Sequence, residues 1–311
     1  MVRFILSFAF LLTCFVVTSA IPQRAVLDFD GDNKTDYAVV RVAPGIRTWY
    51  IQRSTAGFLG QAWGIDTDRD VAADYDGDLK WDIAVWRPGS PATFYIFQSQ
   101  TSTLRVVSFG VTFDDPTITQ DFDGDGKADP AVTRFVGSSK VWYIQRSLLG
   151  FTSVTFGAGA DFPIRGDFDG DGKADQAIYR TNAGTPAFTF FVLRSSDGGV
   201  QAQTFGNNTI DYVFPADFDG DGKTDYAVWR RSTGTFFWLH SLDGSFHAMP
   251  FGASSDIPVP GDFDGDGKTD QAVWRPGAPS NFYVNRSMLG FVAFPFGIDT
   301  DQPSGFYLQV H

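Results

Sequence analysis

Short apolar stretches recur along the chain in a fixed order, separated by turn residues. One stretch reads Tyr37-Ala38-Val39-Val40-Arg41 near the start and Gln271-Ala272-Val273-Trp274-Arg275 near the end. Branched and aromatic residues favour strands, so each copy predicts a β-strand. After a turn comes a second predicted strand, richer in aromatic residues, whose copies are Trp49-Tyr50-Ile51, Phe94-Tyr95-Ile96, Trp142-Tyr143-Ile144, Phe190-Phe191-Val192, Phe237-Trp238-Leu239 and Phe282-Tyr283-Val284.

Two more predicted strands complete each copy. One is a short lead-in such as Ile257-Pro258-Val259-Pro260-Gly261, whose prolines suit a strand with incomplete pairing. No amphipathic helical pattern separates the strands. The last strand of each copy ends in an aromatic–glycine pair: Trp63-Gly64, Phe109-Gly110, Phe156-Gly157, Phe205-Gly206, Phe251-Gly252 and Phe296-Gly297.

An acidic loop follows the lead-in of every copy. The first loop reads Asp28-Phe29-Asp30-Gly31-Asp32-Asn33-Lys34-Thr35-Asp36. Four strands per copy, repeated six times, predict an all-β fold, a six-bladed β-propeller of four-stranded blades. The other loops begin at intervals of 46, 47, 46, 50 and 45 residues, at Asp74, Asp121, Asp167, Asp217 and Asp262.

The predicted propeller is a single domain over residues 21–311. Asp301-Gln302-Pro303 repeats the usual lead-in, and we expect residues 301–311 to close the ring, with Gly305 to Val310 as a strand that clasps the first blade. Seven blades, one of them incomplete, remain an alternative. The predicted repeats span about 24–66, 67–112, 113–160, 161–210, 211–255 and 256–300.

The loops have the composition of calcium sites. Aspartates at the first, third, fifth and ninth positions can surround one calcium ion with hard oxygen ligands. They are not EF-hands, because the twelfth residue is apolar (Val39 in the first copy) instead of glutamate. We therefore expect up to six structural Ca²⁺ ions. The predicted metal residues are Asp28, Asp30, Asp32, Lys34, Asp36, Asp74, Asp76, Asp78, Lys80, Asp82, Asp121, Asp123, Asp125, Lys127, Asp129, Asp167, Asp169, Asp171, Lys173, Asp175, Asp217, Asp219, Asp221, Lys223, Asp225, Asp262, Asp264, Asp266, Lys268 and Asp270.

The charge of the chain agrees with bound metal. All 36 acidic residues are aspartate, and the six loops hold 24 of them. Loss of Arg3 with a cleaved leader would change the net charge from −12 to −13, and six Ca²⁺ ions would add +12, which leaves −1. A merely soluble acidic surface would use glutamate as well and would not group its charges at fixed offsets.

Residues 1–20 have the features of a secretory signal peptide. One early arginine precedes an apolar run from Phe4 to Val17, and the small residues Thr18-Ser19-Ala20 follow. We expect cleavage near Ala20 and a secreted, cell-surface or periplasmic protein without a membrane span in its mature chain. The single cysteine, Cys14, lies in this leader, so the mature chain would have no disulfide.

The loop, the Ala-Val strand after it and the closing Phe-Gly pair resemble the FG-GAP repeat family, also called VCBS repeats, known from the propeller head of integrin α chains. The resemblance covers about residues 24 to 300. It implies that the loop aspartates bind calcium between the first and second strands of each blade. Asn33 and Leu79 replace the glycine at the sixth position, and leucine in a left-handed conformation costs ~1 to 2 kcal/mol. We expect the Asp74 loop to bind most weakly.

Three other residue types recur at fixed places. We expect the alanine at the eleventh position to let neighbouring blades approach closely. The arginine three residues later is expected to bridge adjacent blades, with a role in six ligand pockets as the alternative. Trp86, Trp229 and Trp274 are expected to pack in the core, with sugar stacking as the alternative. The alanines and arginines are Ala38, Ala84, Ala131, Ala177, Ala227, Ala272, Arg41, Arg87, Arg134, Arg180, Arg230 and Arg275.

Residues outside the repeat pattern give few candidates for chemistry. His240 and His247 are expected to be surface polar residues, and no known nucleophile, zinc or phosphate motif occurs. The first hypothesis is a non-catalytic extracellular recognition or adhesion module for a protein or glycan. The alternative is a polysaccharide lyase or hydrolase with its site in the central channel. The acidic chain, without a basic stripe, is not expected to bind nucleic acid.

Overall fold

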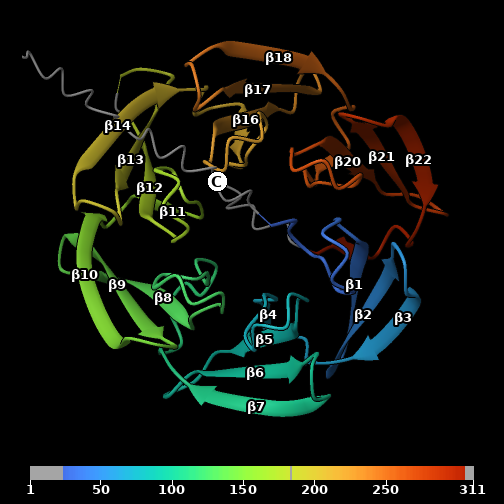
Figure 1. The fold of residues 1–311 in the computed structure, drawn as a ribbon, viewed down its shortest axis with the longest axis horizontal. Helices are drawn as coiled ribbons and strands as arrows, with labels where there is room; N and C mark the ends of the chain where they lie inside the picture. The colour runs from blue at the N-terminus through green and yellow to red at the C-terminus, as the bar shows by residue number, and fades with distance from the viewer. Residues whose placement is uncertain (1–23, 183, 305–311) are drawn as a thin grey trace, which may run out of the picture.

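The computed structural model describes residues 24–182 and 184–304, which form six β-sheets arranged around a ring (Figure 1). The predicted signal peptide, residues 1–20, and the predicted clasp, residues 305–310, lie outside the described residues. The sheets, in strand order from the centre outward, are β23 (Gln302–Pro303), β1 (Tyr37–Ala43), β2 (Ile46–Arg53), β3 (Gly57–Ala62); β4 (Arg69–Asp70), β5 (Ile83–Arg87), β6 (Thr93–Gln98), β7 (Thr103–Ser108); β8 (Ala131–Val136), β9 (Ser139–Arg146), β10 (Gly150–Ala158); β11 (Phe162–Ile164), β12 (Gln176–Thr181), β13 (Phe188–Leu193), β14 (Val200–Phe205); β15 (Asp211–Val213), β16 (Tyr226–Arg230), β17 (Thr235–Leu239), β18 (Phe246–Pro250); β19 (Ile257–Pro258), β20 (Gln271–Arg275), β21 (Asn281–Arg286) and β22 (Gly290–Pro295).

The prediction of an all-β, six-bladed propeller is confirmed. Within each blade, neighbouring strands are antiparallel. The third blade departs in one detail, since its innermost strand is reduced to a single bridge between Asp115 and Thr133. The part of the chain that the structure describes contains no helix capable of crossing a membrane.

The ring closes through a segment far along the chain. In the other blades the innermost position is filled by the lead-in, whereas in the first blade β23 fills it by pairing Gln302 with Val40. The Ser304 N–H also donates to the Ala38 carbonyl, at 3.0 Å. Closure therefore uses residues 302–304, just before the predicted clasp.

The hydrophobic core lies mainly between blades. Six clusters form, and each combines residues of one blade with residues of the next. In the cluster between the first two blades, Trp49 and Ile51 meet Val85. Across the closing junction, Trp274 of the sixth blade meets Val39 of the first. The alanines of the eleventh position are at most 1% exposed, in agreement with close approach of the blades.

The three tryptophans considered for sugar stacking belong to the core. Trp86, Trp229 and Trp274 are at most 1% exposed. Their indole N–H groups donate to the carbonyls of the aromatic–glycine pairs, at 3.1 to 3.3 Å. The expectation of core packing is confirmed.

The repeated arginines fasten the connections between blades. Arg134 makes a bidentate ion pair with Asp114, at 2.6 and 2.7 Å. Asp114 is fully buried and also accepts the Val111 N–H at 2.8 Å, in the connection that leads from the second blade to the third. The expected pairing with carboxylates is present in every blade, but in five blades the partner lies in the arginine's own repeat, at the start of its lead-in. Of the six arginines, Arg41 alone pairs with another part of the ring, because Asp301 comes from the segment after the sixth blade. The expected bridge between blades is therefore found at the closing junction. The other pairs are Arg41–Asp301, Arg87–Asp68, Arg180–Asp161, Arg230–Asp211 and Arg275–Asp256.

The acidic loops interlock around the ring. The N–H of the eighth loop residue donates to the carbonyl of the first aspartate of the preceding loop. The lysine at the seventh position of each loop extends over the fourth-position glycine of the preceding loop. In the third loop, for example, a Cβ on Gly124 would lie 3.1 Å from the side chain of Lys173, which belongs to the fourth loop. The six hydrogen bonds, 2.6 to 2.7 Å long, run from Thr35 to Asp262, Trp81 to Asp28, Ala128 to Asp74, Ala174 to Asp121, Thr224 to Asp167 and Thr269 to Asp217.

Substitution G261A should test the closing junction. A Cβ on Gly261 would lie 2.5 Å from Oγ1 of the buried Thr35, so overpacking should lower the free energy of unfolding by about 1 to 3 kcal/mol. T35A should relieve part of this loss in a double-mutant cycle. G60A is the control, because a Cβ on Gly60 meets only ordinary contacts at 3.6 Å or more. Equal urea midpoints for G261A and G60A would contradict the closed junction.

Candidate metal loops and blade seams

The first aspartate of each loop organises the turn. In the third loop, Oδ1 of Asp121 accepts the Gly124 N–H at 2.6 Å and Oδ2 accepts the Gly126 N–H at 2.8 Å. Both glycines have positive φ, +81° and +82°, which glycine adopts without strain. The chain therefore curls around the Asp121 carboxylate and brings the next aspartates toward it.

The ninth aspartate ties the loop to the outer hairpin of its blade. Asp129 accepts the Phe122 N–H at 2.9 Å and the Ser147 N–H at 2.7 Å. The Ser147 hydroxyl in turn donates to Asp125, the fifth loop residue, at 2.6 Å. The sequence analysis missed this serine, although it recurs directly after the second aromatic strand. The six serines are Ser54, Ser99, Ser147, Ser195, Ser241 and Ser287.

Oxygens at the third position give direct evidence of a fit to a cation. Oδ2 of Asp123 accepts the N–H groups of Leu148 and Leu149, at 3.0 and 2.9 Å. Its other oxygen, Oδ1, is buried and has no hydrogen-bond partner among the described residues, and the same holds for Oδ1 of Asp30 and Asp264. Such an oxygen is costly unless a cation or donor satisfies it. In the third loop, ligand oxygens from Asp121, Asp123 and Asp129 lie within 4.8 Å of one another.

Burial raises the pKa of the first- and ninth-position carboxyl groups of the loops. Desolvation is the largest cause, and it raises the pKa of the ninth-position residues Asp36, Asp129, Asp225 and Asp270 to about 7. Neighbouring loop aspartates add to the shift by charge repulsion. A bound cation would reverse both effects by favouring the ionised carboxylates.

The predicted lysines take part through the backbone. The Lys127 N–H donates to Asp125 at 2.9 Å, whereas the side chain extends over Gly77 of the preceding loop. The lysine side chains therefore join neighbouring loops, and the loop carboxylates supply the candidate ligand oxygens.

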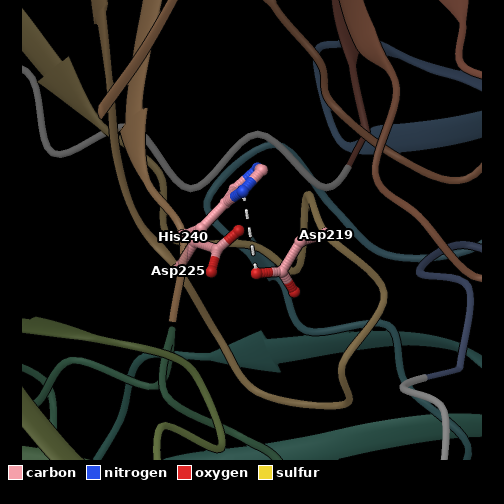
Figure 2. A group of neighbouring side chains, drawn as sticks. All are labelled: Asp219, Asp225 and His240. Atoms are coloured by element: carbon pink, nitrogen blue, oxygen red, sulfur yellow. Dashed lines mark ion pairs between the residues drawn. The ribbon is translucent and has the colours of Figure 1, made fainter. Parts of the chain in front are cut away.

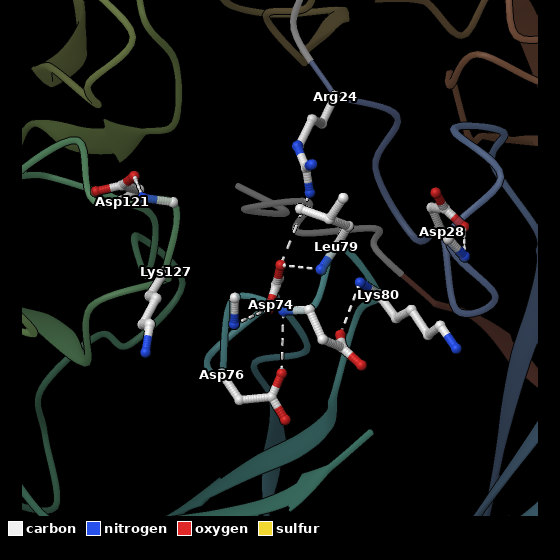
Figure 3. A network of polar contacts seen from close by, with 12 residues as sticks. Arg24, Asp28, Asp74, Asp76, Leu79, Lys80, Asp121 and Lys127 are labelled. Carbon is white, nitrogen blue, oxygen red and sulfur yellow. Dashed lines mark hydrogen bonds and ion pairs between the residues drawn. The ribbon is translucent and has the colours of Figure 1, made fainter. Parts of the chain in front are cut away.

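The Asp74 loop differs from the others as expected. Leu79 has a φ of +77° and Asn33 a φ of +61°, so both residues adopt the left-handed conformation that glycine holds in the other copies. Arg24 also lies 3.8 Å from Asp74, where its positive charge competes with a cation (Figure 3). The backbone strain at Leu79 and the nearby guanidinium are both unfavourable for a cation in this loop, and weaker binding here stays a prediction.

The junctions between consecutive blades, which we call seams, carry exposed phenylalanines on the outermost strands. At the seam between the second and third blades, Phe151 is 59% exposed and stacks on Tyr143, with 6.5 Å between ring centroids. Phe109 of the second blade meets the Phe151 ring edge-on at 6.3 Å. The Arg134 guanidinium covers Tyr143, 4.8 Å from its ring centre.

Four of the six seams share this arrangement. Their exposed rings, which we call the seam phenylalanines, are Phe58, Phe151, Phe246 and Phe291. Leu104 and Val200 occupy the equivalent outer positions in the other two seams and are 55% and 60% exposed.

A cavity of about 630 Å³ lies inside the ring and is lined by residues of all six blades, among them Thr35, Gln120 and Thr224. The first aspartates of five loops also reach its wall. The cavity is the central channel that the enzyme hypothesis would require.

Comparison with known structures shows the fold. Residues align with AofleA from Arthrobotrys oligospora at a TM-score of 0.51 and 9% identity, over 86% of this chain and 88% of that one. The Aleuria aurantia lectin, solved with α-methyl-L-fucoside, aligns at a TM-score of 0.48 and 12% identity, over 86% of this chain and 96% of that one. A candidate 6-phosphogluconolactonase from Bacteroides fragilis aligns at a TM-score of 0.46 and 11% identity, over 88% of this chain and 83% of that one. Comparison with curated proteins gives no match.

Comparison with protein families agrees with the repeat pattern. Residues 217–273, which contain the fifth loop and reach into the sixth repeat, match the FG-GAP-like repeat. The resemblance noted from the loop and strand motifs is thereby confirmed: this six-bladed β-propeller carries FG-GAP-like repeat sequence.

Proposed function

We propose that this protein is a secreted, calcium-stabilised propeller that recognises glycans outside the cell without catalysing a reaction. The observation that carries the proposal is the ring of seam phenylalanines, exposed at equivalent places in four blades. Exposed aromatic rings at repeated sites suit a ligand that itself repeats. A glycan is the first candidate because sugar rings have apolar faces that can lie on aromatic side chains, and a protein ligand for adhesion is the second candidate.

Calcium is proposed for the loops because the residues fit it. Carboxylate oxygens converge in each loop, and three buried oxygens lack a partner. When bound, the ion would neutralise the crowded carboxylates and fix each loop against its outer hairpin. Extracellular modules bind calcium with dissociation constants of ~0.1 to 1 mM. At ~1 mM calcium each filled loop would add about 0.4 to 1.4 kcal/mol to the free energy of unfolding.

Recognition at the seams would use stacking. The apolar face of a sugar ring can lie on an exposed phenylalanine. At the closing seam this ring is Phe58, which stacks on Tyr50 at 6.3 Å and meets Phe296 edge-on at 6.4 Å. Each such contact is weak, and several sites on one rigid ring would raise the overall affinity through avidity.

Metal removal should destabilise the fold in a pH-dependent way. EDTA should lower the melting temperature by more than about 5 °C, because six loops lose their ions. The metal-free protein should then lose stability as the pH rises from about 4 to about 7. The ninth aspartates, with folded-state pKa values of about 7 against an ordinary 3.8, hold protons that the unfolded chain has released. Calorimetry in EDTA and in calcium checks both, and identical melts would rule out structural calcium.

Substitution L79G should strengthen the second loop. Glycine removes the strain of leucine at φ +77°, and after the greater flexibility of the unfolded chain is subtracted, the gain should be about 1 kcal/mol. N33G should gain less, since asparagine tolerates this conformation. Urea unfolding in calcium measures both, and a destabilised L79G would contradict the strain argument.

Replacing the four seam phenylalanines with alanine should abolish glycan binding. Each stacking contact is worth about 1 kcal/mol, so the combined variant should lose more than tenfold in glycan-array signal. L104A/V200A is the matched control, because it truncates the equivalent residues of the seams without phenylalanine and should keep the signal.

The glycan array also distinguishes a non-catalytic binding protein from an enzyme. Undiminished binding by the quadruple variant would exclude the seams, and depletion of a bound polysaccharide would favour a lyase or hydrolase in the central channel.

A further inference from the structure

The fifth loop has a side chain that the other loops lack. His240 stands directly before the recurring serine, at the place where four other blades have an arginine that folds back onto its own hairpin. Three of these arginines, Arg53, Arg146 and Arg286, donate to a glycine carbonyl at 3.0 to 3.1 Å. The fourth, Arg194, pairs with Asp197 at 2.8 Å. His240 instead turns its Nδ1 atom toward the loop, 3.9 Å from Oδ2 of Asp219 (Figure 2).

This histidine completes a group of three potential ligands. Nδ1 of His240 and carboxylate oxygens of Asp219 and Asp225 all lie within 4.8 Å of one another (Figure 2). The Asp225 and Asp219 side chains are held by the Ser241 and Leu242 N–H groups, at 2.6 and 3.3 Å. Metal–nitrogen and metal–oxygen bonds of ~2.0 to 2.2 Å would require the three ligand atoms to come closer together by roughly 1 Å. The His240 side chain is 20% exposed, which leaves it room for this movement.

The imidazole is supported from behind. The rings of His240 and His247 stack with their centroids 3.9 Å apart, and the Trp238 ring stacks on His247 with 5.3 Å between centroids. The Ser245 hydroxyl lies 2.8 Å from Nε2 of His247 and 3.4 Å from Nδ1 of His240. These contacts restrict the orientation of the His240 ring and keep its Nδ1 atom beside the carboxylates.

We propose that the fifth loop is a mixed imidazole–carboxylate site that binds a divalent transition metal of the zinc type. Imidazole nitrogen suits zinc, copper and nickel, whereas calcium prefers oxygen ligands alone. His240, Asp219 and Asp225 supply the protein ligands. The inference shares two carboxylates with the proposed fifth calcium site, but it does not depend on calcium in the other five loops.

Zinc titration of the untagged protein by calorimetry, with millimolar calcium present, tests the proposal. The wild-type chain should bind one Zn²⁺ ion. H240R, which introduces the arginine found in four other blades, should lower zinc affinity by more than about 100-fold, beyond the usual 10- to 100-fold effect of an outer-sphere partner. H240Q repeats the test with the residue that the second blade holds at this place, Gln98, in case arginine disturbs folding. H311A should bind as the wild type does.

A mirror substitution and a spectrum sharpen the outcome. R286H should create a second zinc site in the sixth loop. Cu²⁺ bound to the wild type should show nitrogen hyperfine coupling in its electron paramagnetic resonance spectrum, and H240Q should lose it. The proposal would be overturned if the wild type bound no zinc, or if H240R and H240Q bound zinc as tightly as the wild type does, and the histidines would then have a packing role. An EDTA-insensitive melt with zinc binding intact would reject structural calcium alone.

Discussion

The circle of hydrogen bonds between successive loops is the constraint on which the rest of the structure depends. Each loop gives the N–H of its eighth residue to the loop before it and receives one from the loop after it. The lysine stem that lies over the neighbouring glycine reinforces the contact and explains why the fourth position has no side chain. No loop can shift without moving its neighbours, so the carboxylates that converge in one loop are positioned by the whole ring.

The strictly repeated residues hold the ring together, and the variable ones are where recognition is proposed. The six arginines are committed to buried carboxylates in the connections and to aromatic rings beneath them. By contrast, the outer strand position changes among phenylalanine, leucine and valine, and the position beside the loop serine changes among arginine, glutamine and histidine. Variation at exposed places on a fixed scaffold is typical of binding surfaces.

Most of the fold could be predicted from the sequence because the sequence pattern of one blade recurs six times. The aspartate offsets, an alanine followed by a branched residue in the next strand, and the aromatic–glycine pair each appear in every copy, so the number of blades and the order of their strands could be predicted. Contacts between particular side chains could not be predicted in the same way. The pairing of Arg134 with Asp114 and the stacking of His240 on His247 depend on which side chains turn toward each other across a turn or a connection. The serine that donates to Asp125 recurs visibly, yet its role is clear only in three dimensions.

The order in which the chain emerges during synthesis bears on how the ring is completed. Five blades take all their strands from contiguous sequence, whereas Arg41 of the first blade awaits Asp301, 260 residues later. Until then β1 offers an unpaired edge, and unpaired edges invite pairing with the wrong partner. Contacts this distant in sequence form slowly. The first blade to be made is thus the last to be finished, and the nascent chain stays vulnerable to misassembly for almost the whole of its translation.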